Sequence, residues 1–367
     1  MHNKYQRLFS PFKLGNLNLA NRIVMAPMTR SRAIDNLPND LLTEYYSQRA
    51  SAGLIITEGT SPSPNGLGYA RIPGLFSPEQ ITKWKEVTDA VHENGGKIFV
   101  QLMHTGRITH PLNLPAGAKV VAPSAVAAVN SPMYTDEQGM QPVPVPQAIS
   151  LKDINDTIAE FVHSSKAAIE AGFDGVELHG ANGYLLDQFL NPASNKRDDQ
   201  YGGSADNRNR FVVETAQAVA EAIGKDKVGI RLSPFGVFND LTSDDTTESQ
   251  FISLASSFKE IGIVYIHIVD HSSMGGPVVP QSTRDGIRNA FGGNIILSGG
   301  YDAARAESDL EAGKGELVAF GRPFISNPDL VEKFQTGAEL TEPDFATFYT
   351  PGEKGYTDYR VADEVRA

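Results

Sequence analysis

His179, Asn182 and Tyr184 stand close together in the stretch VELHGANGYLLDQFL, which spans residues 176–190. Imidazole, amide and phenol groups are side chains of the kind that donate hydrogen bonds to ligands or move protons in enzymes. Taken alone, each is more often a buried residue whose hydrogen bonds are satisfied within the protein. The elements that place these three side chains must decide between the two interpretations.

The apolar run AGFDGVEL directly precedes His179 and is typical of a buried parallel strand, so the histidine falls where that strand ends. Similar runs recur along the chain, each followed by a turn and a segment of helical period. The predicted strands are 22–27, 53–59, 97–102, 173–179, 227–233, 264–270, 294–300 and 317–322. This alternation predicts an α/β fold of the (β/α)8 TIM barrel type. A doubly wound sheet also alternates, but the G-x-G-x-x-G loop that usually follows its first strand is absent.

Two segments depart from a minimal barrel. Residues 8–21 predict a short hairpin ahead of the first strand, which can plug the N-terminal mouth. Residues 103–150, between the third strand and the third helix, are too long for an ordinary connection, so we expect a capping excursion over the barrel mouth. Because no linker or internal repeat is recognisable, we expect one domain over residues 1–367.

Barrels of this kind carry their active sites at the C-terminal ends of the strands. In chain order these ends supply Pro27, Met28, Thr29, Glu58, Gly59, Gln101, His179, Arg231, Asp270, His271, Gly299, Gly300, Gly321 and Arg322. Side chains alternate along a strand, so His179 shares the inward face with Glu177. Glu177 and Arg231 fall on neighbouring strands, and a buried ion pair between them is the structural alternative for both.

Two glycine-containing motifs, SGG at 298–300 and GRP at 321–323, follow the last two strands. Loops at these places commonly hold a phosphate group, although glycines that only form tight turns are the alternative for either motif alone. A flavin mononucleotide (FMN) combines a phosphate with a ring whose edge Gln101 can read as both donor and acceptor. Arg231 can stabilise the reduced, anionic ring, and the Thr29 hydroxyl can donate toward it.

Other barrel chemistries fit these strand ends less well. Metal-dependent hydrolases use a His-x-His on the first strand, and this sequence contains none. His267, Asp270 and His271 form the only local cluster that suggests a metal, so we expect no metal site. Schiff-base aldolases need a lysine inside the barrel, whereas the strand lysines here lie at the opposite mouth. Glycosidases need two facing carboxylates, for which Glu177 with Asp270 is a weak pair.

The composition limits the partners and the location of the protein. The 44 acidic and 32 basic residues give a formal net charge of −12, which disfavours nucleic acid and anionic membranes. The chain has no cysteine, which excludes disulfides, thiolate metal sites and cysteine nucleophiles. Because it shows no signal-peptide core and no apolar run long enough to span a membrane, we expect a cytoplasmic protein.

Longer motifs are also recognisable: IVMAPMTRSRA, YYSQRASAGLIITEGT, GYARIPGLFSPEQ, VQLMHTGRITHP, the stretch from AGFDGVELHGANGY to YGGSADNRNRF, GIRLSP, VAFGRPFISNPDL and FYTPGEKGYTDY. Together they resemble the Old Yellow Enzyme family of FMN-dependent ene-reductases, most of all its bacterial N-ethylmaleimide, xenobiotic and nitrate-ester reductase branch. The likeness runs from about residue 8 to residue 359, and the His-x-x-Asn-Gly-Tyr motif is highly specific.

This resemblance implies roles for individual residues. Contacts with the flavin ring and ribityl chain are implied for Pro27, Met28, Thr29, Gly59, Gln101 and Arg231, and contacts with the phosphate for Gly299, Gly300, Gly321 and Arg322. His179 and Asn182 would hold the carbonyl or nitro oxygen of the substrate. Tyr184 would donate a proton, and Tyr69 and Tyr349 would line the pocket.

The implied activity is a ping-pong reduction of electron-poor alkenes, such as enones, maleimides and nitroalkenes, and also of nitro or nitrate-ester compounds. Hydride from NADPH or NADH would reach the β-carbon by way of FMN, and Tyr184 would protonate the α-carbon from the opposite face. Met103 stands where many relatives of this branch have a tryptophan, which changes one wall of the pocket. We expect a monomer or homodimer. A non-catalytic flavin- or ligand-binding barrel and a metal-dependent barrel hydrolase remain the alternatives.

Overall fold

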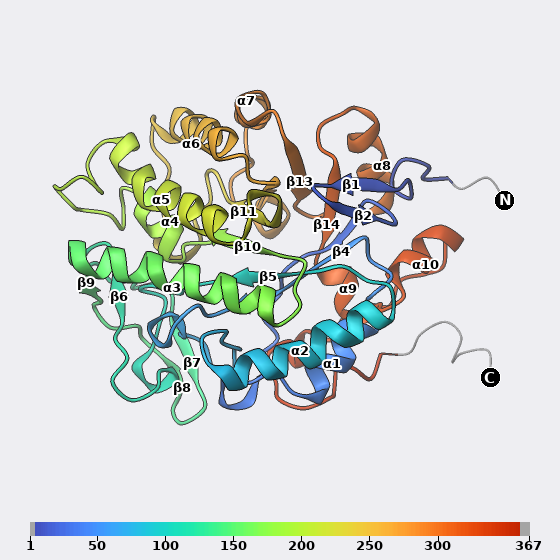
Figure 1. The fold of residues 1–367 in the computed structure, drawn as a ribbon, viewed down its shortest axis with the longest axis horizontal. Helices are drawn as coiled ribbons and strands as arrows, with labels where there is room; N and C mark the ends of the chain where they lie inside the picture. Colours follow the sequence, from blue (N-terminus) through green and yellow to red (C-terminus); the bar gives the residue numbers. More distant parts are fainter. Residues whose placement is uncertain (1–3, 360–367) are drawn as a thin grey trace.

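The computed structural model describes residues 4–359, and all eight predicted barrel strands are present. They are β3 (Ile23–Met25), β4 (Leu54–Thr60), β5 (Ile98–Leu102), β10 (Gly175–Gly180), β11 (Val228–Leu232), β12 (Tyr265–Val269), β13 (Asn294–Ser298) and β14 (Leu317–Phe320). Neighbouring strands pair in parallel, β14 pairs with β3, and β5 closes the ring on β10. The predicted (β/α)8 barrel is confirmed, with helices around the closed sheet (Figure 1).

The two helix starts with the clearest signals in the sequence show how local chemistry fixes the helix bounds. Ser77 caps α2 (Pro78–Glu93) and Ser150 caps α3 (Leu151–Glu170), each through a capping box that satisfies backbone N–H groups at the helix start. The other helices are α1 (Asp40–Ser47), α4 (Leu185–Leu190), α5 (Ala205–Ile223), α6 (Thr247–Ile261), α7 (Gln281–Phe291), α8 (Ala303–Glu311), α9 (Arg322–Ser326) and α10 (Leu330–Thr336).

The predicted N-terminal hairpin forms from the antiparallel strands β1 (Phe12–Leu14) and β2 (Leu17–Leu19). Leu14 and Leu19 are buried against residues of the barrel interior, including Phe99 and Tyr265. Because the hairpin also contacts Asp226, just ahead of β11, it closes the N-terminal mouth as expected.

Residues 103–150 form the predicted cap at the other mouth. Its small sheets are β6 (Val121–Ala122) with β9 (Gln147–Ala148) and β7 (Met133–Thr135) with β8 (Gly139–Gln141). The apolar cluster of this segment packs against Tyr69 and Tyr184, which brings the cap next to the predicted site. Figure 1 shows these strands at the opposite end of the molecule from the hairpin. Within residues 4–359, no helix is long and apolar enough to cross a membrane.

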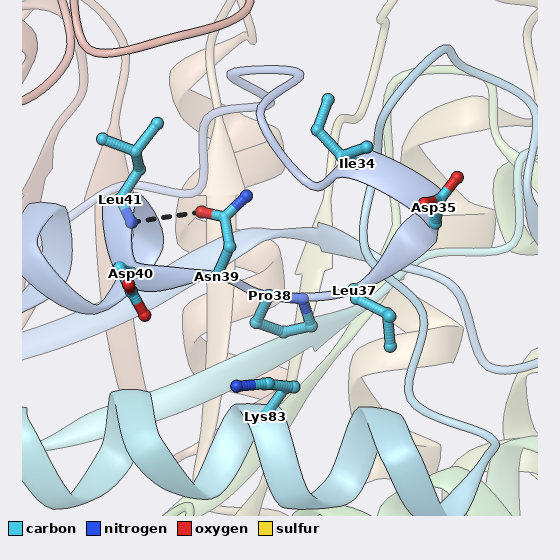
Figure 2. A pocket seen from close by; sticks show the side chains of 8 residues that line it. All are labelled: Ile34, Asp35, Leu37, Pro38, Asn39, Asp40, Leu41 and Lys83. Carbon is cyan, nitrogen blue, oxygen red and sulfur yellow. Dashed lines mark hydrogen bonds between the residues drawn. The ribbon is translucent and has the colours of Figure 1, made fainter.

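A surface hollow of about 380 Å³ lies between residues 34–41 and α2 (Figure 2). The side-chain oxygen of Asn39 turns back to the backbone N–H of Leu41, 3.1 Å away, and thereby caps α1. Lys83, on the other wall, pairs with Glu86 at 2.9 Å. Asn39 and Lys83 thus serve a helix start and a surface ion pair, and none of the predicted site residues lines the hollow.

Candidate active site

His179 lies at the C-terminal end of β10, in register with Arg231 of β11, and the residue is 3% exposed. Its Nδ1 is buried without a hydrogen-bond partner among the described residues. Burial lowers the pKa of His179 well below its usual range, and the charge of Arg231 lowers it further. The imidazole is therefore neutral at physiological pH, with one N–H to donate.

The chain turns sharply after β10 because Asn182 and Gly183 adopt left-handed conformations, with φ of 60° and 77°. Contacts from other strand ends hold the turn in place. The backbone N–H of Asn182 donates to Ser233 Oγ at 2.9 Å, and its carbonyl accepts from Asn239 Nδ2 at 2.7 Å. Its side-chain Oδ1 lies 2.9 Å from Nε2 of His271. The orientation of this side chain is thus set by the backbone and by a residue that follows β12, two strands along the sheet.

Tyr184 is the residue immediately before α4, and its ring meets the ring of His179 edge-on at a centroid separation of 4.9 Å. Its hydroxyl lies 2.9 Å from the hydroxyl of Tyr69. Burial raises the pKa of Tyr184 above its ordinary value, so the phenol keeps its proton at neutral pH. The structure therefore brings together a neutral imidazole, an oriented amide and a protonated phenol.

Asp187, in the first turn of α4, stabilises the chain turn at Asn182 and Gly183 through hydrogen bonds. Its Oδ2 accepts hydrogen bonds from the backbone N–H of Gly183 at 2.9 Å and from Ser233 Oγ at 3.3 Å. Burial raises the pKa of Asp187 to about 7. Ser233 and Asp187 thus connect the turn that carries Asn182 to the barrel and to α4.

The ion pair between Glu177 and Arg231, which is the structural alternative for both residues, does not form. Glu177 accepts hydrogen bonds from Gln101 Nε2 at 2.8 Å and from the Tyr265 hydroxyl at 3.1 Å, and it lies 2.9 Å from His267 Nδ1. The register explains the difference, because Arg231 is level with His179, two residues nearer the mouth than Glu177. Glu177 instead fixes the amide of Gln101, whose side-chain oxygen has no partner among the described residues.

Arg231 is 8% exposed, and its guanidinium forms no hydrogen bond or ion pair with another described residue. Its Nε is buried, and burial lowers the pKa of the group. Leaving a charged donor buried and unpaired is unfavourable by several kcal/mol in general, unless a ligand supplies the acceptor. Arg231 therefore fits a ligand with a carbonyl or anionic edge at the barrel mouth.

Glycines follow β13 and β14, so the backbone there is not covered by side chains of its own. A Cβ on Gly299 would lie 2.4 Å from the carbonyl oxygen of Asp270, and one on Gly300 would lie 2.5 Å from Ser273 Cβ. Both positions have positive φ, so only glycine fits. Gly321 precedes α9, where the side chain of Arg322 is exposed. These two loops can offer amides and a guanidinium to a phosphate.

Met103 is buried in an apolar cluster with Leu67 and Ile72. Tyr69 and Tyr184 pack against the same cluster. A Cβ on Gly59 would lie 2.5 Å from both the Sδ and the Cε of Met103. The methionine therefore occupies the space that a side chain at residue 59 would need.

The structure gives fewer contacts for the remaining predicted residues. Pro27 is buried, and Met28 and Thr29 are partly buried at the end of β3. The Thr29 hydroxyl forms no hydrogen bond with another described residue. The Met28 Sδ lies 3.5 Å from where a Cβ of Gly321 would be, which links the ends of β3 and β14.

Tyr349 is 62% exposed and does not join the cluster of His179 and Tyr184 through any hydrogen bond. Its carbonyl accepts a hydrogen bond from Arg71 at 2.9 Å. The buried Arg30 and Arg32 bind the surrounding segment by donating to carbonyls between residues 347 and 355. These arginines were not predicted as site residues, and only their position after the first strand could have drawn attention to them.

The suspected metal cluster has other contacts. His271 hydrogen-bonds Asn182, His267 hydrogen-bonds Glu177, and Asp270 pairs with Arg284. Among residues 4–359, no group of three or more His, Asp or Glu side chains could hold a metal ion. The sequence places His271 at a strand end and in the suspected metal cluster, but it does not predict the contact of His271 with Asn182.

Fold and site together define a barrel flavoenzyme, and the sequence comparison agrees. Residues 7–341 match the NADH:flavin oxidoreductase / NADH oxidase family, and the chain belongs to this family of FMN-dependent oxidoreductases. A protein of Leishmania infantum described as a probable flavin mononucleotide-dependent alkene reductase is 40% identical over 96% of both chains.

Solved structures give the same result. Morphinone reductase superposes with a TM-score of 0.95 and 43% identity, covering 100% of this chain and 99% of that one. The old yellow enzyme homologue of Zymomonas mobilis superposes with a TM-score of 0.92 and 38% identity, covering 97% and 99%. The resemblance to the Old Yellow Enzyme family is therefore confirmed. FMN as cofactor and a reduced nicotinamide nucleotide as reductant are confirmed with it, and morphinone reductase has also been solved with tetrahydroNAD.

Proposed function

We propose that this protein reduces the C=C bond of electron-poor alkenes, namely enones, maleimides and nitroalkenes, and also reduces nitro and nitrate-ester compounds. NADPH or NADH is oxidised first and leaves, and the alkene then takes its place in a ping-pong cycle. The observation that carries the proposal is the contact of the neutral His179 imidazole with the phenol of Tyr184, which keeps its proton, with the oriented amide of Asn182 on the turn between them.

The residues at the mouth fit FMN, which when bound supplies hydride transfer between the nicotinamide and the alkene. Gln101 and Arg231 would hold the flavin ring together with Pro27, Met28, Thr29 and Gly59. The phosphate would be held by Gly299, Gly300, Gly321 and Arg322. The buried, unpaired Nε of Arg231 and the free side-chain oxygen of Gln101 support this assignment, since both lack a partner within the described protein.

His179 and Asn182 polarise the substrate by hydrogen-bonding its carbonyl or nitro oxygen, where negative charge develops during hydride transfer. Removing one such donor typically slows a reaction about a hundred- to a thousandfold, and we expect a loss of this order for His179→Ala. Tyr184 donates its proton to the α-carbon from the face opposite the hydride, giving net trans addition. Tyr69, Met103 and Tyr349 line the substrate side.

Anaerobic absorbance spectroscopy tests the two halves of the cycle separately. NADPH should bleach the flavin absorbance of the holoenzyme, and cyclohexenone or N-ethylmaleimide should restore it. Tyr184→Phe should keep the rate of bleaching while the rate of restoration falls, and Tyr69→Phe is the matched control that removes the partner hydroxyl instead.

Three outcomes would contradict the proposal. The proposal fails if the purified protein does not bind FMN. If the protein binds FMN but NADPH does not bleach the flavin absorbance, the protein is a non-catalytic flavin-binding barrel. Equal losses in both half-reactions of Tyr184→Phe would show that the phenol is not the proton donor.

A further inference from the structure

His271 follows β12 at the barrel mouth and is buried against the turn that carries Asn182. Its Nε2 lies 2.9 Å from Oδ1 of Asn182, although the two residues are 89 positions apart in the sequence. The other side of the imidazole is covered by Phe238, whose ring meets it at a centroid separation of 4.5 Å and an angle of 63°. The imidazole is therefore held in place independently of any ligand.

The hydrogen bonds of Asn182 leave one group for a ligand. Its backbone N–H is bound to Ser233, its carbonyl to Asn239, and its Oδ1 to His271. No partner for its Nδ2 occurs among residues 4–359. An amide held this way presents a donor, which is what a carbonyl or nitro oxygen requires.

The opposite orientation of the same amide would oppose catalysis. A half-turn about the Cβ–Cγ bond exchanges Oδ1 and Nδ2, and the ligand would then meet an acceptor that repels its oxygen. A neutral imidazole decides between the two orientations by which of its nitrogens carries the proton. Burial, and after it the charge of Arg231, lower the pKa of His271 to about 4, so the ring is neutral at physiological pH.

We propose that His271 is a positioning residue that donates its Nε2–H to Oδ1 of Asn182 and thereby holds Nδ2 toward the substrate oxygen. This inference rests on the proposed function, because it assigns a purpose to an amide that binds the substrate there. It adds a residue that touches neither the substrate nor the flavin. It also explains why a polar ring is buried where an apolar one would pack equally well against Phe238.

Two substitutions separate the hydrogen bond from the packing. His271→Phe keeps a planar ring but cannot donate, whereas His271→Gln places an amide N–H near the position of Nε2. We expect His271→Phe to slow restoration of the flavin absorbance by cyclohexenone about 10- to 100-fold, and His271→Gln to stay within about fivefold of the parent protein. Phe238→Leu, which changes the packing of the same ring but leaves the hydrogen bond, is the matched control and should change the rate little.

A binding measurement provides a readout other than turnover. Cyclohexanone carries the carbonyl oxygen but no reducible C=C bond, so its dissociation constant can be measured from the shift of the flavin absorbance. His271→Phe should weaken its binding about tenfold or more, and His271→Gln should restore it. In an Asn182→Ala background, His271→Phe should have no further effect, because the amide that it orients has been removed.

The outcomes distinguish this inference from the function on which it rests. If the parent protein is not bleached by NADPH or not restored by cyclohexenone, the proposed function fails. The inference is overturned if the parent protein completes both half-reactions but His271→Phe and His271→Gln slow restoration of the flavin absorbance equally. It is also overturned if His271→Phe still weakens cyclohexanone binding in the Asn182→Ala background. Either result would show that His271 has only a packing role. Should His271→Phe not retain FMN, His271→Leu replaces it in the same comparison, with the same expected loss.

Discussion

Replacing Asp187 by asparagine should stabilise the protein at alkaline pH and have a much smaller effect near pH 4. The carboxyl is buried and accepts both of its recorded hydrogen bonds at Oδ2, from Gly183 and Ser233. An asparagine can accept the same two bonds through its amide oxygen, with the NH2 group in the place of Oδ1. The substitution therefore imitates the protonated acid and removes only the possibility of a buried charge.

The size of the effect follows from the pKa of Asp187, which burial raises from 3.8 to about 7. Because the pKa is higher in the folded state than in the unfolded state, the protonated acid contributes to the stability of the fold. This contribution is fully present below pH 3.8 and is lost as the pH rises to about 7. The difference corresponds to about 4 kcal/mol at 1.36 kcal/mol per pH unit. The free energy of unfolding of Asp187→Asn should thus exceed that of the parent protein by an amount that grows by about 1.4 kcal/mol per pH unit between pH 4 and 7, and then stays constant.

Urea unfolding between pH 4 and 9, followed by the fluorescence of the single tryptophan, Trp84, measures this difference. Trp84 is fully buried, so unfolding exposes it to water. FMN must be at the same saturating concentration throughout, because a ligand bound only to the native state adds to its stability. Asp245→Asn, at an exposed carboxylate, is the matched control and should show no such trend. A stability difference for Asp187→Asn that does not vary with pH would refute the reasoning.

The remaining predictions concern the flavin and the reaction. Arg231→Met should weaken FMN binding at least about tenfold, measured by the recovery of flavin fluorescence on release, and unchanged affinity would contradict the role of the unpaired guanidinium. Gly59→Ala should lower the FMN content and the thermal stability, because the new methyl group would clash with the side chain of Met103. Adding Met103→Ala should reverse part of this loss. If the two substitutions instead lower stability additively, the clash is not the cause. In the Asp187→Asn protein, the rate constant for alkene reduction should be constant from about pH 6 to 9, since the pKa values of His179 and Tyr184 are displaced outside that range. Burial also raises the pKa of Glu58 to about 7, so a step near pH 6.5 that persists in Glu58→Gln would show that His179 titrates.

The sequence predicts the barrel well because its strands are short apolar runs between recognisable helix starts, such as Ser77 and Ser150. The same regularity predicts which residues end each strand, and so it places His179 at the mouth. It does not predict which side chains lie level with one another, because that depends on the stagger of the closed barrel. For this reason the predicted partner of Glu177 is wrong, and its actual neighbours include His267 of a strand two further along the sheet.

Contacts between loops at the mouth were also beyond prediction. Asn182 meets His271 because two turns of different strands approach each other after the barrel closes, and no local pattern encodes that approach. The turn itself depends on a left-handed asparagine, a conformation that asparagine tolerates better than most residues but does not require. The sequence therefore places His179, Asn182 and Tyr184 at one strand end, but it does not predict the orientation of the Asn182 amide.

Burial holds three ionisable side chains of the mouth, His179, Tyr184 and His271, in their neutral forms. His179 and His271 are kept from gaining a proton, and Tyr184 is kept from losing one. Arg231 keeps its charge, because a guanidinium stays protonated even where burial lowers its pKa. A second positive charge near Arg231 would add repulsion within the same buried space, which is one of the causes that depress the pKa of both histidines. In the proposed reaction, His179 and Tyr184 would therefore act as neutral donors, and the fixed charge of Arg231 would be left for the ligand edge beside it. The protonation states of these three groups would then stay the same across the physiological pH range.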